Sequence, residues 1–191
     1  REQLRSGGRI QQAESIPMSM SAGVYVEIAR LNFLRDAYDR AEQGLDNALI
    51  MADVNPKNPN VKDDVELMRA AIAMLRGDLD KAENHLEQAN RLRPEIEGVN
   101  HPTMPEITVH RALLADLRGQ RQEADNLFEQ ALSKLVGQSG SEAGARLLEN
   151  NIWIFEKSLE YRKNAYGADA EPTRKAEERL ELAKENAFKK E

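Results

Sequence analysis

Small and large apolar residues recur along this chain at a nearly constant spacing. Ala41, Ala82, Ala124 and Ala165 stand 41, 42 and 41 residues apart. Three of these alanines are followed by a large apolar residue four positions on and a second alanine seven positions on: Leu45 and Ala48, Leu86 and Ala89, Phe128 and Ala131. A fixed period of this length is typical of repeat proteins, in which each supersecondary unit packs against the next. The sequence therefore predicts a repeat architecture.

Within each period the apolar residues recur at three- and four-residue spacing, which predicts pairs of amphipathic helices. We expect the first pair at about 22–34 and 38–54. The apolar side of its first helix is predicted to carry Val24, Ile28, Leu31 and Phe33. The second pair turns at Gly77 and ends at Pro94, because proline lacks the amide donor that a helix interior needs. The third pair turns at Gly119. The pattern as a whole predicts an all-α fold.

The chain departs from this plan at both ends. A long helix at about 142–165 is predicted as a degenerate fourth unit, and we assign residues 171–191 to a polar capping helix, since nothing packs on the last element of a stack. Residues 1–21 contain glycine and proline breaks and predict a flexible linker or the remnant of a preceding element. The repeat domain accordingly covers 22–170, in units at about 22–60, 61–100, 101–140 and 141–170.

Composition and charge exclude several classes of function. The 191 residues are 40% hydrophobic and 31% charged, which is ordinary for a soluble helical protein and too apolar for a disordered one. The net charge of −6 disfavours nucleic-acid binding. No run of 18 apolar residues is present, so we expect no direct membrane insertion. Cysteine is absent and the three histidines lack metal-binding spacing, so we expect neither a metal nor another cofactor.

Two of the units resemble a known repeat family. The turn glycine, the small residues and the larger residue between them stand at the spacing of the tetratricopeptide repeat: Gly77, Ala82, Leu86, Ala89 and Pro94, and then Gly119, Ala124, Phe128 and Ala131. The long period, with His101-Pro102 eighteen residues before Gly119, resembles the kinesin-light-chain-like variant. Unit one has Arg35-Asp36-Ala37 where the turn glycine belongs. The resemblance implies a right-handed superhelix of helical hairpins with a concave groove that binds peptides or partner proteins.

The resemblance also implies which residues line the groove, because the first helix of each hairpin faces it in this family. By position these are Val26, Arg30, Phe33, Leu67, Ala71, Met74, Val109, Leu113 and Asp116, with His110 nearby. Such a strip suits an amphipathic helix or an extended peptide. The alternatives are burial between hairpins, covering by the chain's own C-terminal helix, and a homo-oligomer contact. Trp153 is expected as a buried anchor of the last helix pair, with an exposed recognition residue as its alternative.

The leading functional hypothesis is a non-enzymatic adaptor or assembly scaffold that binds a protein or peptide partner in its groove. An enzyme is disfavoured because no nucleophile, base and orienting group can be assembled from spacing. The alternatives are a structural or oligomerising subunit of a larger complex and a peptide-sensing regulatory domain of a longer protein. We favour a cytoplasmic location. An exported or periplasmic location is the alternative if a signal upstream of Arg1 was removed.

Overall fold

The computed structural model describes residues 21–54, 61–97 and 104–188. These residues form eight helices: α2 (Ala22–Phe33), α3 (Tyr38–Val54), α4 (Val61–Leu75), α5 (Leu79–Glu97), α6 (Met104–Leu117), α7 (Arg121–Gln138), α8 (Glu142–Tyr166) and α9 (Glu171–Ala187). The expected linker, apart from Ser21, and the His101-Pro102 pair lie outside the described residues.

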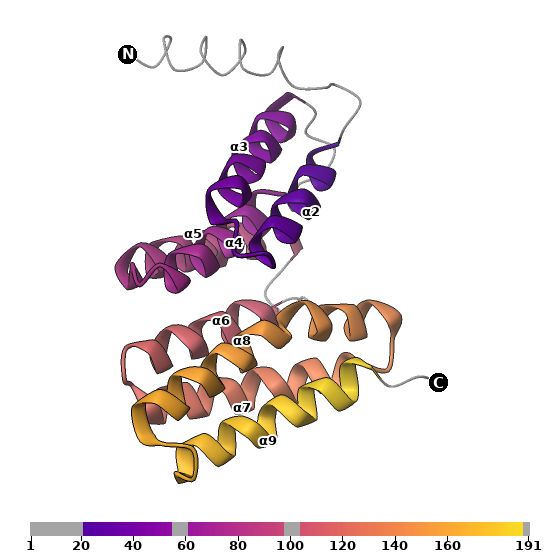
Figure 1. Ribbon diagram of the computed structural model, residues 1–191. Helices are drawn as coiled ribbons and strands as arrows, with labels where there is room; N and C mark the ends of the chain where they lie inside the picture. The colour runs from indigo at the N-terminus through magenta and orange to yellow at the C-terminus, as the bar shows by residue number, and fades with distance from the viewer. Residues whose placement is uncertain (1–20, 55–60, 98–103, 189–191) are drawn as a thin grey trace.

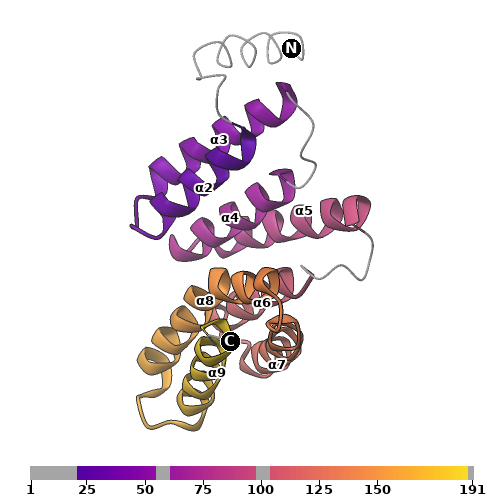
Figure 2. The same cartoon turned by 90° about the vertical axis from the view of Figure 1, so that its right-hand side faces the viewer.

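Consecutive helices pair as antiparallel hairpins, which confirms the predicted all-α plan of helix pairs. The pairs are α2/α3, α4/α5, α6/α7 and α8/α9 (Figure 1). The first helices of successive hairpins also contact one another, as α2 with α4, α4 with α6 and α6 with α8. Figure 2 shows the first, second and later hairpins following one another down the molecule. The first helices therefore form a continuous layer.

The turns inside the first three hairpins share one backbone conformation. Gly77 and Gly119 have φ values of 79° and 75°, and Asp36 has a φ of 56° at the matching place in the first hairpin. Glycine adopts this left-handed region without the steric cost that a Cβ atom brings, and aspartate tolerates it better than most residues. The Asp36 carboxylate accepts a hydrogen bond of 2.7 Å from the hydroxyl of Tyr38. The first hairpin therefore has the same positive φ at its turn as the next two, with Asp36 in place of glycine.

We expect Gly77→Ala to lower the free energy of unfolding by about 1–2 kcal/mol, because alanine is strained in the left-handed region. A Cβ atom at Gly77 would have nothing within 4 Å, so the backbone alone causes the loss. Gly137→Ala is the matched control, since this α7 glycine has equally open surroundings and no positive φ. It should gain up to about 1 kcal/mol from helix propensity. Urea unfolding measures both, and changes of the same sign would contradict the turn geometry.

The alanine motifs pack the second helix of each hairpin into the interior. Both alanines of the first three motifs are fully buried, as are the residues between them: Ala41, Leu45 and Ala48, Ala82, Leu86 and Ala89, Ala124, Phe128 and Ala131. The small residues let helices approach closely, and the larger residue fills the remaining space. The expected tight packing of these positions is confirmed.

The fourth motif lies farther along the chain than the regular period indicated. Ala165 is exposed near the end of α8. Ala176, Leu180 and Ala183 of α9 repeat the spacing of the motif and are buried. The period lengthens here because α8, at 25 residues, is much longer than the other first helices. The helix expected as a polar cap is therefore the second helix of the fourth hairpin.

Two local expectations need correction. Helix α5 runs to Glu97, so Pro94 does not end it. Proline has no amide donor, so α5 continues past Pro94 with one backbone hydrogen bond fewer. In α2 the buried side carries Tyr25, Val26 and Ala29, whereas Val24 is 41% exposed. A Cβ atom at Gly44 of α3 would lie only 3.1 Å from the Ala29 Cβ, so the two helices approach closely at this point. This close contact turns the Ala29 side of α2 toward the interior.

Candidate functional site

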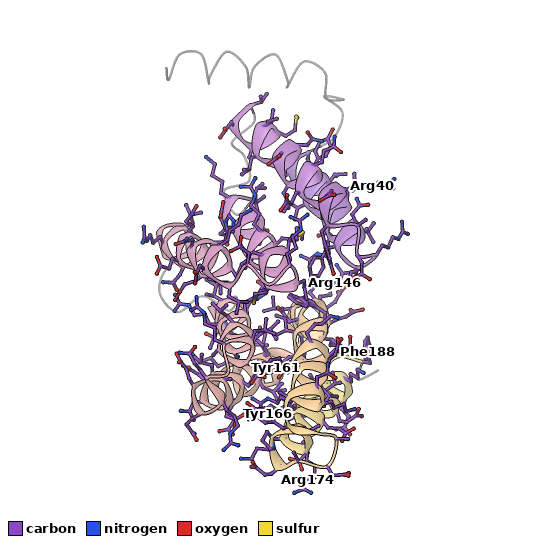
Figure 3. The ribbon with its side chains drawn as sticks, turned by 60° about the vertical axis from the view of Figure 1, so that its left-hand side comes forward. Arg40, Arg146, Tyr161, Tyr166, Arg174 and Phe188 are labelled. Atoms are coloured by element: carbon purple, nitrogen blue, oxygen red, sulfur yellow. The ribbon has the colours of Figure 1, made fainter. Side chains whose placement is uncertain are left out.

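A pocket of about 310 Å³ opens along the first helices of all four hairpins, and we call it the first-helix pocket. Its apolar lining comes from α2 and the residue after it, from α4 and α8, and from the residue after α9: Phe33, Leu34, Leu67, Met68, Ala71, Ile152, Trp153 and Phe188. Phe188 lies beside α8 in Figure 3, whereas Tyr166 and Arg174 mark the opposite end of the fourth hairpin. The pocket therefore joins segments from both ends of the described chain.

Trp153 forms an aromatic wall between three hairpins. Its ring centroid is 5.0 Å from that of Phe33 in α2 and 5.6 Å from that of His110 in α6. The interplanar angles are 73° and 70°, which is the edge-to-face arrangement that aromatic rings prefer. The side chain is half-buried and packs against both hydrophobic core clusters. Trp153 thus does not anchor only the last helix pair but holds together the wall of the pocket.

The charged lining of the pocket is mainly acidic. Its carboxylates come from α4, α6 and α8: Asp64, Glu106, Glu149 and Glu156. Arg30 is the guanidinium in the lining, and its Nε lies 3.7 Å from Glu27. The Lys184 ammonium reaches Glu156 at 3.2 Å from outside the lining. The lining has four carboxylates and one guanidinium, and Lys184 offsets one of the carboxylates from outside, so the formal charge around the pocket stays negative but is smaller than the lining alone indicates.

Asn151 brings a buried polar group to the pocket. Its side chain is 1% exposed, and its Nδ2 donates to the Leu147 carbonyl oxygen at 2.7 Å and lies 3.5 Å from Glu106 Oε1. Its Oδ1 has no hydrogen-bond partner among the described residues. Buried polar atoms are nearly always partnered, so an exception at a pocket wall is informative. Nearby, His110 Nδ1 lies 2.8 Å from the Glu106 carbonyl oxygen, which can only accept, so Nδ1 carries the proton.

The structure brings five of the ten expected groove residues to the first-helix pocket: Arg30, Phe33, Leu67, Ala71 and His110. The other five are buried away from it: Val26, Met74, Val109, Leu113 and Asp116. A first helix packs against its own hairpin partner and against neighbouring first helices, so most of its circumference is interior. Family position alone therefore does not separate pocket residues from core residues. Trp153 was not among the expected groove residues, although as the single tryptophan of the chain it was the sequence signal that could have indicated this wall.

Asp116, expected at the groove, lies in a buried ion-pair cluster between the third and fourth hairpins. Arg162 of α8 is fully buried, and its Nη2 and Nε approach the two Asp116 carboxylate oxygens at 2.8 Å each. Ser158 Oγ also donates to Asp116. Arg162 Nη1 reaches the Pro172 carbonyl oxygen at 3.1 Å and Asp125 at 2.8 Å. This cluster therefore fixes α8 against α6, α7 and the start of α9.

Within the cluster, the surroundings of Asp125 and Arg162 favour the charged form of each. Burial by itself raises the pKa of Asp125, but hydrogen bonds from Arg179 and Arg162 outweigh it and hold that pKa below its usual range. Burial lowers the pKa of Arg162, but its interactions with Asp116 and Asp125 outweigh this effect and raise it. Arg162 and Asp116 are 46 residues apart. No local sequence pattern identified this pair, because neither residue belongs to the repeat motif.

Comparisons with known proteins leave the family open. No known family model matches the sequence. A search of curated proteins likewise finds no match.

In the part of the chain that the structure describes, no helix is long and apolar enough to cross a membrane. Across the same residues, no group of three or more histidine, aspartate or glutamate side chains is placed to hold a metal ion.

Proposed function

We propose that this protein is a non-enzymatic adaptor or assembly scaffold that holds a segment of a partner protein in the first-helix pocket. The observation that carries this proposal is the pocket itself, which is lined by the first helix of every hairpin and whose lining is largely apolar and partly aromatic. Such a lining offers anchoring sites for the apolar side chains of a bound segment. Aromatic side chains are also enriched at the energetically dominant positions of protein interfaces.

The proposal includes a tetratricopeptide-like superhelix. Its support is the recurrence of one motif in the second helices, at Ala41, Ala82, Ala124 and Ala176, together with the shared turn conformation in the first three hairpins. The continuous layer of first helices provides the inner surface that such an architecture requires. A right-handed sense of the superhelix belongs to the same proposal.

The proposed mechanism is preorganisation. The pocket walls belong to helices that are packed on several sides, and Trp153 is held by Phe33 and His110. Binding then orders the incoming segment but not the receptor. Because association loses free energy whenever groups at an interface must be immobilised, a receptor that is ordered in advance binds more tightly.

Leu34→Glu tests this proposal because Leu34 lines the pocket and is 61% exposed, so the variant is expected to fold. Val54→Glu is the control, an exposed apolar residue at the end of α3 that lies outside the pocket. Both are compared with the wild-type protein in affinity capture followed by mass spectrometry. A partner lost with Leu34→Glu and retained with Val54→Glu supports the adaptor. A partner retained by both variants would place the interaction elsewhere.

A second candidate function is an oligomerising subunit, and the outward face of α2 favours it. Val24 and Leu31 are exposed on this face, with Ile28 between them half-buried. An apolar stripe on the first described helix is a feature of association surfaces. Sedimentation equilibrium of the wild-type protein and of the Val24→Glu/Leu31→Glu variant tests it. A concentration-dependent mass that the variant abolishes would support self-association through α2.

A further inference from the structure

The acidic groups of the first-helix pocket are arranged at two depths. Asp64 of α4 and Glu106 of α6 are half-buried, whereas Glu149 and Glu156 of α8 are exposed at the rim. Charges in partly buried positions are screened less by salt than exposed charges. An incoming cation therefore meets carboxylates first at the rim and then along the wall. An incoming anion meets the same carboxylates, with Arg30 as the one opposing guanidinium in the lining.

The aromatic wall suits a cation with an apolar stem. Trp153 is the best of the aromatic residues at attracting an ammonium or guanidinium group to its ring face. Beside it, Phe33, Leu67 and Met68 provide apolar surface in the same pocket. Lysine and arginine side chains combine these two requirements, because their methylene stems pack on apolar surface while the charged end reaches polar groups.

Asn151 provides an acceptor for such a group. Asn151 is one of the lining residues, its Oδ1 is buried without a hydrogen-bond partner among the described residues, and its Nδ2 donates to the Leu147 carbonyl oxygen. The missing partner must therefore be a donor. Lysine and arginine side chains carry only donors, whereas a carboxylate carries only acceptors.

We propose that the first-helix pocket selects a basic side chain, lysine or arginine, presented by a partner segment next to an apolar residue. The carboxylates attract the charge, the Trp153 ring and Asn151 Oδ1 contact the cationic end, and the apolar lining residues contact the neighbouring residue. This inference rests on the proposed function, since it names the chemistry of the segment that the adaptor binds. The negative charge of the lining favours this occupant over an acidic or purely apolar segment.

The test begins with a phage-displayed library of random 12-residue peptides, selected on the wild-type protein and counter-selected on Leu34→Ser, which removes the apolar side chain without adding a carboxylate to the pocket. We expect peptides that depend on Leu34 to be several-fold enriched in lysine or arginine beside an apolar residue. A synthetic copy of the most enriched peptide is then titrated by the fluorescence of Trp153, the single tryptophan of the chain. Replacing its basic residue by glutamine should weaken binding at least about tenfold.

Glu149→Lys tests the acidic rim from the side of the protein. We expect it to weaken binding of the same peptide about tenfold and to reduce the dependence of binding on salt. Glu160→Lys is the matched control, an exposed glutamate of the same helix that lies outside the pocket. It should change the dissociation constant by no more than about twofold. Circular dichroism establishes that both variants fold.

The other outcomes separate this inference from the proposed function. Peptides that depend on Leu34 but are not enriched in basic residues would overturn the basic-side-chain inference and leave the adaptor standing. Equal weakening by Glu149→Lys and Glu160→Lys would also overturn it, since only general attraction would then operate. Failure to select any peptide that depends on Leu34 would count against both the inference and the peptide-binding adaptor.

Discussion

Arg162→Ala is expected to lower the free energy of unfolding by about 3–5 kcal/mol. Arg162 is fully buried and bridges Asp116, Asp125 and the Pro172 carbonyl oxygen. Removing the guanidinium leaves the buried Asp116 carboxylate without its counter-charge. An uncompensated buried charge is far more destabilising than the loss of an exposed ion pair.

Urea unfolding followed by circular dichroism measures this loss. The control is Lys157→Ala on the same helix, which breaks an exposed pair with Glu160 at 2.9 Å. It should cost less than about 1 kcal/mol. The double variant Arg162→Met/Asp116→Leu should recover a large part of the stability, because it removes both charges together. A loss below about 1 kcal/mol for Arg162→Ala would show that this cluster is not buried as described.

Leu113→Glu is expected to lower the free energy of unfolding by at least about 4 kcal/mol. Leu113 is fully buried in the hydrophobic cluster that spans the second, third and fourth hairpins. Burial raises the pKa of the introduced carboxyl group, because the charged form is poorly solvated there. A raised folded-state pKa makes the deficit smallest at low pH and larger as pH rises through neutrality.

The control for this prediction is Leu31→Glu, the same chemical change at a leucine that is 54% exposed. It should alter stability by no more than about 0.5 kcal/mol. Thermal and urea unfolding at acid and neutral pH compare the two variants. If the two variants have the same free energy of unfolding, Leu113 is not buried and lines an open groove, as the family resemblance implied.

The buried ion-pair cluster and the first-helix pocket are connected through α8. Arg162 holds the C-terminal half of this helix against Asp116 of α6, while Trp153, nine residues earlier, lines the pocket. Because a helix is a stiff element, fixing one half also fixes the direction of the other. Correct placement of the Trp153 wall therefore depends on a cluster that is not part of the pocket.

Local patterns in the sequence determined the order of helices, the hairpin turns and the motif that packs the second helices. The turn at Gly77 and the spacing of Ala82, Leu86 and Ala89 are encoded by residues a few positions apart, so periodicity and turn chemistry reveal them. The fourth motif at Ala176 was readable by the same spacing. Its stripe was assigned to a capping helix instead of a fourth repeat motif, because the unusual length of α8 breaks the regular period.

Only the tertiary structure decided which sides of the first helices are core and which line the pocket. Phe33 and Leu113 are both buried apolar residues of first helices, yet only Phe33 also lines the pocket. The contact of Trp153 with Phe33 and the pairing of Arg162 with Asp116 likewise join distant parts of the chain. Such contacts depend on how closely particular helices approach, which no local spacing encodes.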